Sequence, residues 1–101
     1  MRVTFDTKFQ SDFKQVSRAL PHIKSEMREL IFAIEELGEV PEGYNPHLLV
    51  NSRSTYTGYW GLHLLEGRYD VIVVYTQHAS ESAIRFIRIG SHKEIFHGKE
   101  L

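Results

Sequence analysis

The sequence predicts an α+β domain in which a pair of N-terminal helices packs on one face of an antiparallel sheet. Two observations predict it. Apolar residues recur every three or four positions through residues 7–37, and the second half of the chain consists of strand-like runs. Those runs lie at about residues 58–66, 68–77 and 82–90. An alternation around Val3 and Phe5 predicts one more strand, so the expected order is β-α-α-β-β-β.

The helical hairpin is bounded by capping and proline signals. The first helix is expected to begin at Thr7, because Thr7 and Gln10 resemble a capping box. It should end at Leu20, because Pro21 follows. Pro21 is expected in the first turn of the second helix, and Gly38 should end that helix with a left-handed cap. The buried faces are expected to hold Phe9, Phe13, Val16 and Leu20, then Ile23, Met27, Leu30, Ile31, Ile34 and Leu37.

The segment between the helices and the strands, residues 39–57, is rich in Pro, Gly, Asn and Ser and is expected to be a loop. A loop of this length in a small domain is often functional. The middle strand-like run, Val71–Tyr75, is apolar on both faces, which is typical of a central strand. Because the helices cover one face of the sheet, the other face can hold a site.

The composition excludes several classes of function. The chain of 101 residues contains no cysteine, which rules out thiol chemistry and cysteine-based metal sites. No apolar run reaches membrane-spanning length and the N-terminus lacks the apolar stretch of a signal peptide, so a cytoplasmic location is expected. The net charge of -1 argues against strong nonspecific binding of nucleic acid. Any such role must rest on local basic patches.

Five polar residues stand where the predicted topology can bring them together. They are His47 in the long loop, His63 on the second strand, Asp70 at the start of the third, Arg88 on the last strand and His92 just after it. Because antiparallel strands turn back on each other, we expect His63, Asp70 and Arg88 to approach one another on one sheet face. Period-two alternation places Arg88 on the same face as Ile84 and Phe86.

Cleavage of an RNA phosphodiester needs side chains of these types. A base removes the proton of the ribose 2′-OH, and an acid protonates the departing 5′-oxygen. A cation stabilises the charge that builds up on the phosphate. Histidine suits proton transfer near neutral pH, and the planar fork of arginine suits phosphate oxygens. The set can therefore act without a metal ion.

Each of these residues also has a purely structural interpretation. A loop histidine such as His47 is usually only solvated, and a strand histidine is often a half-buried residue with a local partner. Asp70 can simply cap a strand or pair with Arg68 or Arg88, and Arg88 can be a surface residue of a strand edge. The segment 91–96 can form a helical turn that covers the end of the sheet. In isolation, the structural interpretation is the better one for His47 and His63.

A pattern over residues 46–96 changes that balance. It consists of PHL at 46–48, GYWGLH at 58–63, YDVIVVY at 69–75 and RFIRIGSHKEIF at 85–96. Together these stretches resemble the YafQ-like branch of the RelE/ParE superfamily of type II toxins, and the helical hairpin agrees in length and place. The ending Arg-x-Gly-x-His-x-x-apolar-Phe at 88–96 is the most specific part. One departure stands out, because Trp60-Gly61 replaces the charged pair of the family's second strand.

The resemblance implies a RelE-like fold and a single toxin domain over residues 1–101. It implies a ribosome-dependent endoribonuclease, an mRNA interferase that cleaves through 2′-OH attack with no metal and no cofactor. The implied catalytic residues are His47, His63, Asp70, Arg88, His92 and Phe96. Our hypothesis makes His92 the acid, His47 or Asp70 the base, His63 a support for the transition state, Arg88 the phosphate contact and Phe96 a packing or base-stacking residue beside His92.

The resemblance also implies partners. A cognate antitoxin should wrap this surface with an amphipathic or extended segment, and operator DNA should be reached only through that antitoxin. The ribosome and messenger RNA are the other expected partners. We expect Trp60, Leu64 and Ile95 to lie outside the core and to contact the antitoxin.

Three other functions remain open at the level of sequence. A ParE-like inhibitor of DNA gyrase would use the same fold without the histidines. An inactive, partner-binding relative is consistent with Trp60-Gly61 and with the slightly acidic net charge. A metal-dependent hydrolase built from three histidines and an aspartate has the least support, because no HExxH spacing occurs.

Overall fold

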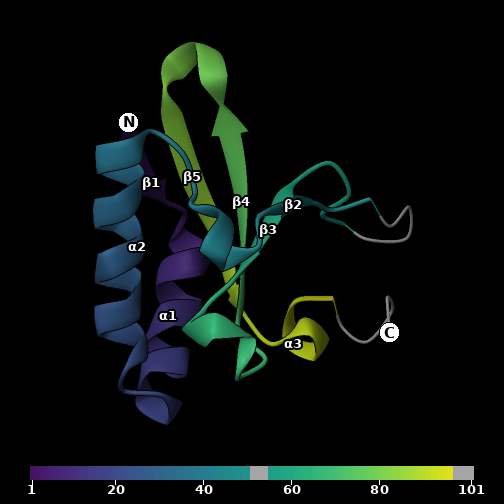
Figure 1. The fold of residues 1–101 in the computed structure, drawn as a ribbon. Coiled ribbons are helices and arrows are strands. Elements are labelled where there is room, and N and C mark those ends of the chain that lie inside the picture. The colour runs from purple at the N-terminus through teal and green to yellow at the C-terminus, as the bar shows by residue number, and fades with distance from the viewer. Residues whose placement is uncertain (51–54, 97–101) are drawn as a thin grey trace.

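The computed structural model describes residues 1–50 and 55–96, which form a five-stranded sheet with helices on both of its faces (Figure 1). The strands are β1 (Arg2–Phe5), β2 (His47–Leu48), β3 (Trp60–His63), β4 (Ile72–His78) and β5 (Ala83–Gly90). The α-helices are α1 (Thr7–Ala19), α2 (Ile23–Leu37) and α3 (His92–Phe96). Single turns of 3-10 helix are η1 (Glu42–Tyr44), η2 (Leu65–Gly67) and η3 (Ala79–Glu81). No described helix has the length and apolar character needed to cross a bilayer.

The strand order is β1-β5-β4-β3-β2, and two features of the sheet differ from the prediction. First, β1 pairs parallel to β5, whereas the other pairs are antiparallel as expected. Alternation within one strand does not encode the direction of its neighbour, so the sequence pattern could not show this. Second, part of the predicted loop is an edge strand, because His47 and Leu48 pair with Gly61 and Trp60. The prediction of a central β4 is confirmed, since Val71–Tyr75 is buried throughout.

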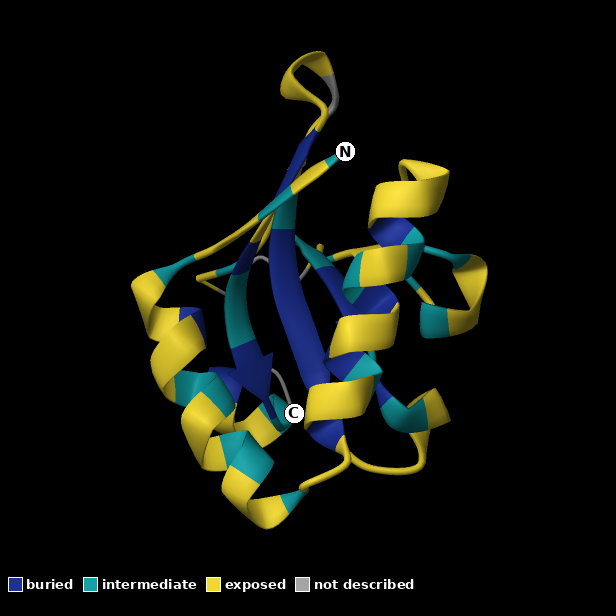
Figure 2. Cartoon of the chain, turned by 90° about the vertical axis from the view of Figure 1, so that its left-hand side faces the viewer, coloured by how far each residue is buried: buried dark blue, intermediate teal, exposed yellow. Residues whose placement is uncertain are grey.

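The larger core lies between the sheet and the helical hairpin, where α1 and α2 cover one face (Figures 1 and 2). Its buried members are Phe9, Ile23, Met27, Leu30, Ile34, Val40, Leu62, Leu64, Val71, Val73, Tyr75, Ile84, Phe86 and Ile89. The predicted buried faces are therefore largely correct. Leu37 is an error, because it is 62% exposed. As the last residue of α2, it has no following turn to cover it.

The ends of the hairpin helices follow the sequence signals in part. Gly38 has φ of 76° and caps α2 in the left-handed conformation, as predicted. The end of α1 at Leu20 is also confirmed. The capping box is wrong, because Asp6 is the N-cap and its side chain makes no capping bond. Pro21 precedes the N-cap of α2, His22, so it lies in the connecting turn rather than in the helix.

A smaller core on the opposite face holds α3 against the sheet. Ile72, Val74, Ile95 and Phe96 are its buried members. The helical turn considered for residues 91–96 is therefore present and covers this end of the sheet. Two expectations are wrong here, because Leu64 is 0% and Ile95 is 1% exposed, so neither lies outside the core. Trp60 is half-buried and stacks on Tyr75, with ring centroids 6.4 Å apart.

A β-bulge in β5 changes the face on which Arg88 lies. Val74 pairs with Arg88 and Tyr75 pairs with Phe86, which leaves Ile87 as the extra residue. Beyond the bulge the alternation is inverted. The prediction that Arg88 shares a face with Ile84 and Phe86 is therefore wrong, and Arg88 lies instead on the face of Val74 and α3.

The cap of α2 offers a direct test of this local structure. Gly38→Ala should lower the free energy of unfolding by about 1 kcal/mol, because a Cβ is disfavoured at positive φ. Gly43→Ala is the matched control, since Gly43 has no positive φ and a Cβ there would meet no atom within 4 Å. Urea unfolding of both variants checks the expectation, and equal losses of stability would contradict it.

Candidate active site

Four rings that come from three separate segments form a row on the α3 side of the sheet. The ring centroids of His47 and His63 are 5.6 Å apart, those of His63 and His92 are 6.0 Å apart, and those of His92 and Phe96 are 6.0 Å apart. His47 belongs to β2, His63 to β3, and His92 and Phe96 to α3. The structure thus brings together three histidines that lie far apart in the sequence, at positions 47, 63 and 92.

Strand pairing and a small residue create the first contact of this row. His47 lies opposite Gly61 in the β2–β3 pair, and His63 follows two positions later on the same face. A Cβ at Gly61 would lie 3.5 Å from Cε1 and Nε2 of His47 and 3.2 Å from a methyl carbon of Leu49. Gly61 therefore gives the His47 ring room to lie over the strand beside His63. The glycine of Trp60-Gly61, which stands where the family has a charged pair, thus leaves space for this contact between the two histidines.

Asp70 holds His92 through both its ring and its backbone. The Asp70 Oδ1 atom lies 2.6 Å from Nδ1 of His92, and the backbone N–H of His92 donates to Oδ1 and Oδ2 at 3.3 and 3.2 Å. Since a carboxylate only accepts, Nδ1 carries the hydrogen and Nε2 is the nitrogen available to a substrate. Asp70 therefore pairs with His92 and not with Arg68 or Arg88.

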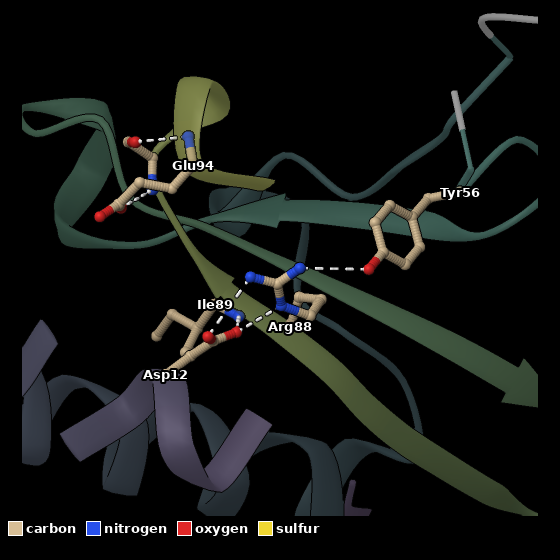
Figure 3. Close-up of polar contacts among 6 residues, drawn as sticks. Asp12, Tyr56, Arg88, Ile89 and Glu94 are labelled. Atoms are coloured by element: carbon tan, nitrogen blue, oxygen red, sulfur yellow. Dashed lines mark hydrogen bonds and ion pairs between the residues drawn. The ribbon is translucent and has the colours of Figure 1, made fainter. Parts of the chain in front are cut away.

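A capping box at α3 fixes the position of His92 further. The backbone N–H of Ser91 donates to Oε1 of Glu94 at 2.9 Å, and the backbone N–H of Glu94 donates to Oγ of Ser91 at 3.1 Å (Figure 3). This reciprocal pair is the Ser-x-x-Glu motif at a helix start. The spacing was visible in the sequence, so it could have predicted α3.

The turn between His63 and Asp70 is strained. Leu65, Glu66 and Gly67 have φ of 54°, 55° and 74°, a region that non-glycine residues rarely adopt. Such strain persists only where neighbouring groups hold it. Glu26 of α2 stabilises this turn, because its Oε2 accepts a hydrogen bond from the backbone N–H of Leu65 at 2.6 Å. The helical hairpin thereby helps to set where Asp70 begins the next strand.

The electrostatics of the row favour a neutral His63. Burial lowers the pKa of His63, the nearby His47 and His92 lower it further, and Asp70 opposes them. For Asp70, burial alone would raise the pKa. The hydrogen bonds from His92 and the positive charges of His92 and His63 outweigh that effect, so the pKa of Asp70 is lowered. Asp70 is therefore ionised at neutral pH, as its role as an acceptor requires.

Arg88, whose strand partner Val74 also pairs with Gly61 of β3, is held from two sides (Figure 3). Its Nε donates to Oδ2 of Asp12 at 2.6 Å, its Nη2 donates to Oδ1 of Asp12 at 3.3 Å, and its Nη1 donates to the Tyr56 hydroxyl at 3.2 Å. The ring of Tyr56 also contacts Phe96, with centroids 6.4 Å apart. Tyr56 and Phe96 thus connect the guanidinium to the row of rings.

Sequence reasoning missed Asp12 and Tyr56. Asp12 follows the buried Phe9 by three positions, so it lies on the sheet-facing side of α1, and an acidic residue there signals a buried partner. Tyr56 lies in the predicted loop and carried no comparable signal. The hydrogen bonds to Asp12 and Tyr56 raise the pKa of Arg88, so its cation persists at every physiological pH.

His22 and His78 are exposed, and His97 lies outside the described residues. Within residues 1–50 and 55–96, no three histidines or carboxylates are arranged to hold a metal ion.

The fold is that of small bacterial toxins of known structure. The metal-bound toxin from Helicobacter pylori matches with a TM-score of 0.72 at 21% identity, over 95% of this chain and 99% of that one. YafQ in the E. coli DinJ-YafQ complex matches with a TM-score of 0.71 at 23% identity, and YafQ from E. coli strain BL21(DE3) with 0.70 at 21%, both over the same shares. At these identities the likeness shows the fold alone.

The family follows from the sequence itself. No curated protein matches the chain. The family model described as the bacterial toxin of type II toxin-antitoxin system, YafQ, matches residues 1–97. The chain therefore belongs to the YafQ family of type II toxins, and the resemblance found in the sequence is confirmed.

The row of rings can be tested by proton titration. Since His47 lowers the pKa of His63, the variant His47→Asn should raise that pKa. Asp70 acts in the opposite sense, so Asp70→Asn should lower it. NMR titration of the imidazole carbon-bound protons measures both shifts. The exposed His78→Gln variant is the control and should leave the pKa of His63 unchanged. Shifts of the same sign in both site variants would show that the rings do not interact as described.

Proposed function

We propose that this toxin is an endoribonuclease that cleaves messenger RNA on the ribosome, by attack of the ribose 2′-OH on the adjacent phosphate. The observation that supports the proposal best is the meeting of three imidazoles beside a carboxylate that orients one of them. A ParE-like gyrase inhibitor or an inactive relative would need no such set. The ribosome enters the proposal through the resemblance to YafQ-like toxins, not through a feature of this surface.

His92 is the proposed general acid. Its Nδ1 is engaged by Asp70, so the tautomer and the orientation of the ring are fixed. Its Nε2 can therefore deliver a proton to the departing 5′-oxygen. The Asp70–His92 pair is partly exposed, with side chains 53% and 42% accessible, so a substrate can reach it. Phe96 lies beside His92 and is only 8% exposed, so of the two roles suggested for it we propose packing against the ring of His92.

His63 is the proposed base, which changes the division of roles that the sequence suggested. A base must be neutral before it takes a proton, and the lowered pKa of His63 keeps it neutral at pH 7. Asp70 is less suited, because it is already bound to His92. His47 stacks on His63 and is the second candidate. The centroids of His63 and His92 are 6.0 Å apart, so both rings can contact one phosphodiester group.

Arg88 is the proposed phosphate contact and supplies the cation that the transition state needs. No metal or cofactor is part of the proposed reaction. The proton moves from the 2′-OH to His63, the 2′-oxygen bonds to phosphorus, and the 5′-oxygen leaves with a proton from His92. The products are a 2′,3′-cyclic phosphate and a 5′-hydroxyl end.

An antitoxin is the proposed protein partner, as expected for a type II toxin, and operator DNA would be reached only through it. The E. coli toxin YafQ has been crystallised with DinJ as such a complex. Since Leu64 and Ile95 are buried, they are replaced as candidate contacts by the exposed apolar side chains. These are Phe5, Phe32, Leu37, Leu48, Val50 and Tyr69.

The proposal is tested with His92→Gln in a cleavage assay on ribosomes programmed with a defined message. Glutamine can still donate to Asp70 but cannot transfer a proton, so cleavage should fall by roughly a hundredfold or more. The control His78→Gln changes a histidine at the exposed end of β4 and should cleave normally. Near-normal cleavage by His92→Gln would remove His92 from the mechanism. Growth arrest with intact messages and relaxed DNA would instead favour the gyrase inhibitor.

A further inference from the structure

We propose that Asp12 is a positioning residue, which fixes the guanidinium of Arg88 in the orientation that phosphate binding needs. The inference rests on the proposed function, because it assigns Asp12 a task in the same reaction. Asp12 comes from α1, in the N-terminal half of the chain, whereas all the residues considered above for chemistry lie at position 47 or later.

The carboxylate of Asp12 is anchored by the unpaired edge of β5. β1 covers that edge only as far as the pair Phe5–Phe86, and the last bond there runs from the N–H of Asp6 to the carbonyl of Phe86. Farther along, α1 lies beside the strand. Oδ2 of Asp12 accepts the backbone N–H of Ile89 at 3.2 Å. This bond gives the backbone N–H of Ile89 an acceptor at the strand edge and holds the carboxylate in place.

The same carboxylate binds Arg88 side-on. Oδ2 accepts Nε–H and Oδ1 accepts Nη2–H, the two-bond geometry that fits the guanidinium plane to a carboxylate. Tyr56 takes one N–H of Nη1. A guanidinium has one N–H on Nε and two on each terminal nitrogen. Three of them are used by described residues, so one N–H on each terminal nitrogen is left for phosphate oxygens.

The burial of the pair explains why its geometry is fixed. The side chains of Arg88 and Asp12 are only 11% and 15% exposed. Removal of one partner would leave a charge that water hardly reaches. The arginine therefore cannot choose among rotamers when a substrate approaches, and its remaining donors are oriented before binding. Asp12 also offsets part of the charge of Arg88, so the direction of the remaining donors matters in addition to the charge.

A second ion pair between the same elements provides a matched control. Asp6, the N-cap of α1, pairs with Arg85 of β5 at 2.7 Å. This pair is more exposed, with side chains 31% and 55% accessible. It lies before the bulge and makes no contact with Tyr56 or the row of rings among the described interactions. Asp6→Asn thus removes a comparable charge from α1 without touching Arg88.

The experiment measures kcat and KM for cleavage on programmed ribosomes with Asp12→Asn, Arg88→Gln, the double variant and Asp6→Asn. Asparagine keeps the shape of Asp12 but replaces one acceptor oxygen by a donor group, so Arg88 loses a bond. Asp12→Asn should lower kcat by roughly ten- to a hundredfold, and Asp6→Asn should not change it. The double variant should be no slower than Arg88→Gln alone, because Asp12 acts through Arg88.

Thermal unfolding of each variant separates positioning from folding. If Asp12→Asn is unfolded at the assay temperature, Asp12→Glu replaces it, since it keeps the charge and displaces the carboxylate by one methylene group. That variant should also cleave more slowly. If folded Asp12 variants cleave at the rate of Asp6→Asn, the inference is overturned and the proposed function stands. The same holds if the rate loss of the double variant equals the product of the two single losses, because Asp12 would then act independently of Arg88. A wild-type protein that leaves messages intact would overturn the proposed function, and this inference with it.

Discussion

The pairing of Ile72 with His63 on one side and with Gly90 on the other sets the geometry of the whole site. It aligns the ends of three strands. Asp70 lies two residues before Ile72, and His92 lies two residues after Gly90, so both leave the sheet at the same corner as His63. A shift of one residue in either pairing would turn every side chain of that strand to the other face. The apolar residues of β4 prevent such a shift, because Ile72 and Val74 pack under α3 while Val73 and Tyr75 pack under the hairpin.

The parts of the fold that the sequence predicted are those with strong local patterns. The stripes of α1 and α2, the cap at Gly38 and the two-sided apolar character of β4 each reflect one element and its solvent exposure. The convergence of His63 with Asp70 was predictable for the same reason, since adjacent antiparallel strands bring them together. What could not be predicted depends on partners distant in sequence. These features are the parallel pairing of β1, the short β2 strand and the bulge at Ile87.

That bulge explains the error about Arg88. Strict alternation would place the guanidinium among Ile84 and Phe86, in the core beneath the helices. One extra residue turns it toward the face of the histidines, so a charge that would be costly in the core lies where Asp12 and Tyr56 can bind it. Asp12 then completes the arrangement, because it satisfies both the cation and the strand edge. The sequence around Arg88 or around Asp12 does not by itself indicate that the two side chains bind each other.

The two carboxylates near the site differ in what they contribute. Asp70 and His92 are half exposed, and such pairs add little to stability, so the value of this bond lies in the orientation of the imidazole. Asp12 and Arg88 are shielded from water, and their bond constrains the fold as well as the cation. Gly61 makes a third contribution, because its missing side chain admits the ring of His47. The candidate site is thus assembled from α1 as well as from residues 47–96.

The chemistry of the cut is the most direct test of this account. On a programmed ribosome, a message that carries a 2′-deoxynucleotide immediately 5′ of the cleavage position lacks the proposed nucleophile and should remain intact at that position. The unmodified message should yield a 2′,3′-cyclic phosphate. Normal cleavage of the deoxy message, or products that end in a 3′-hydroxyl and a 5′-phosphate, would contradict the account, because a nucleophile other than the 2′-OH would then attack the phosphate.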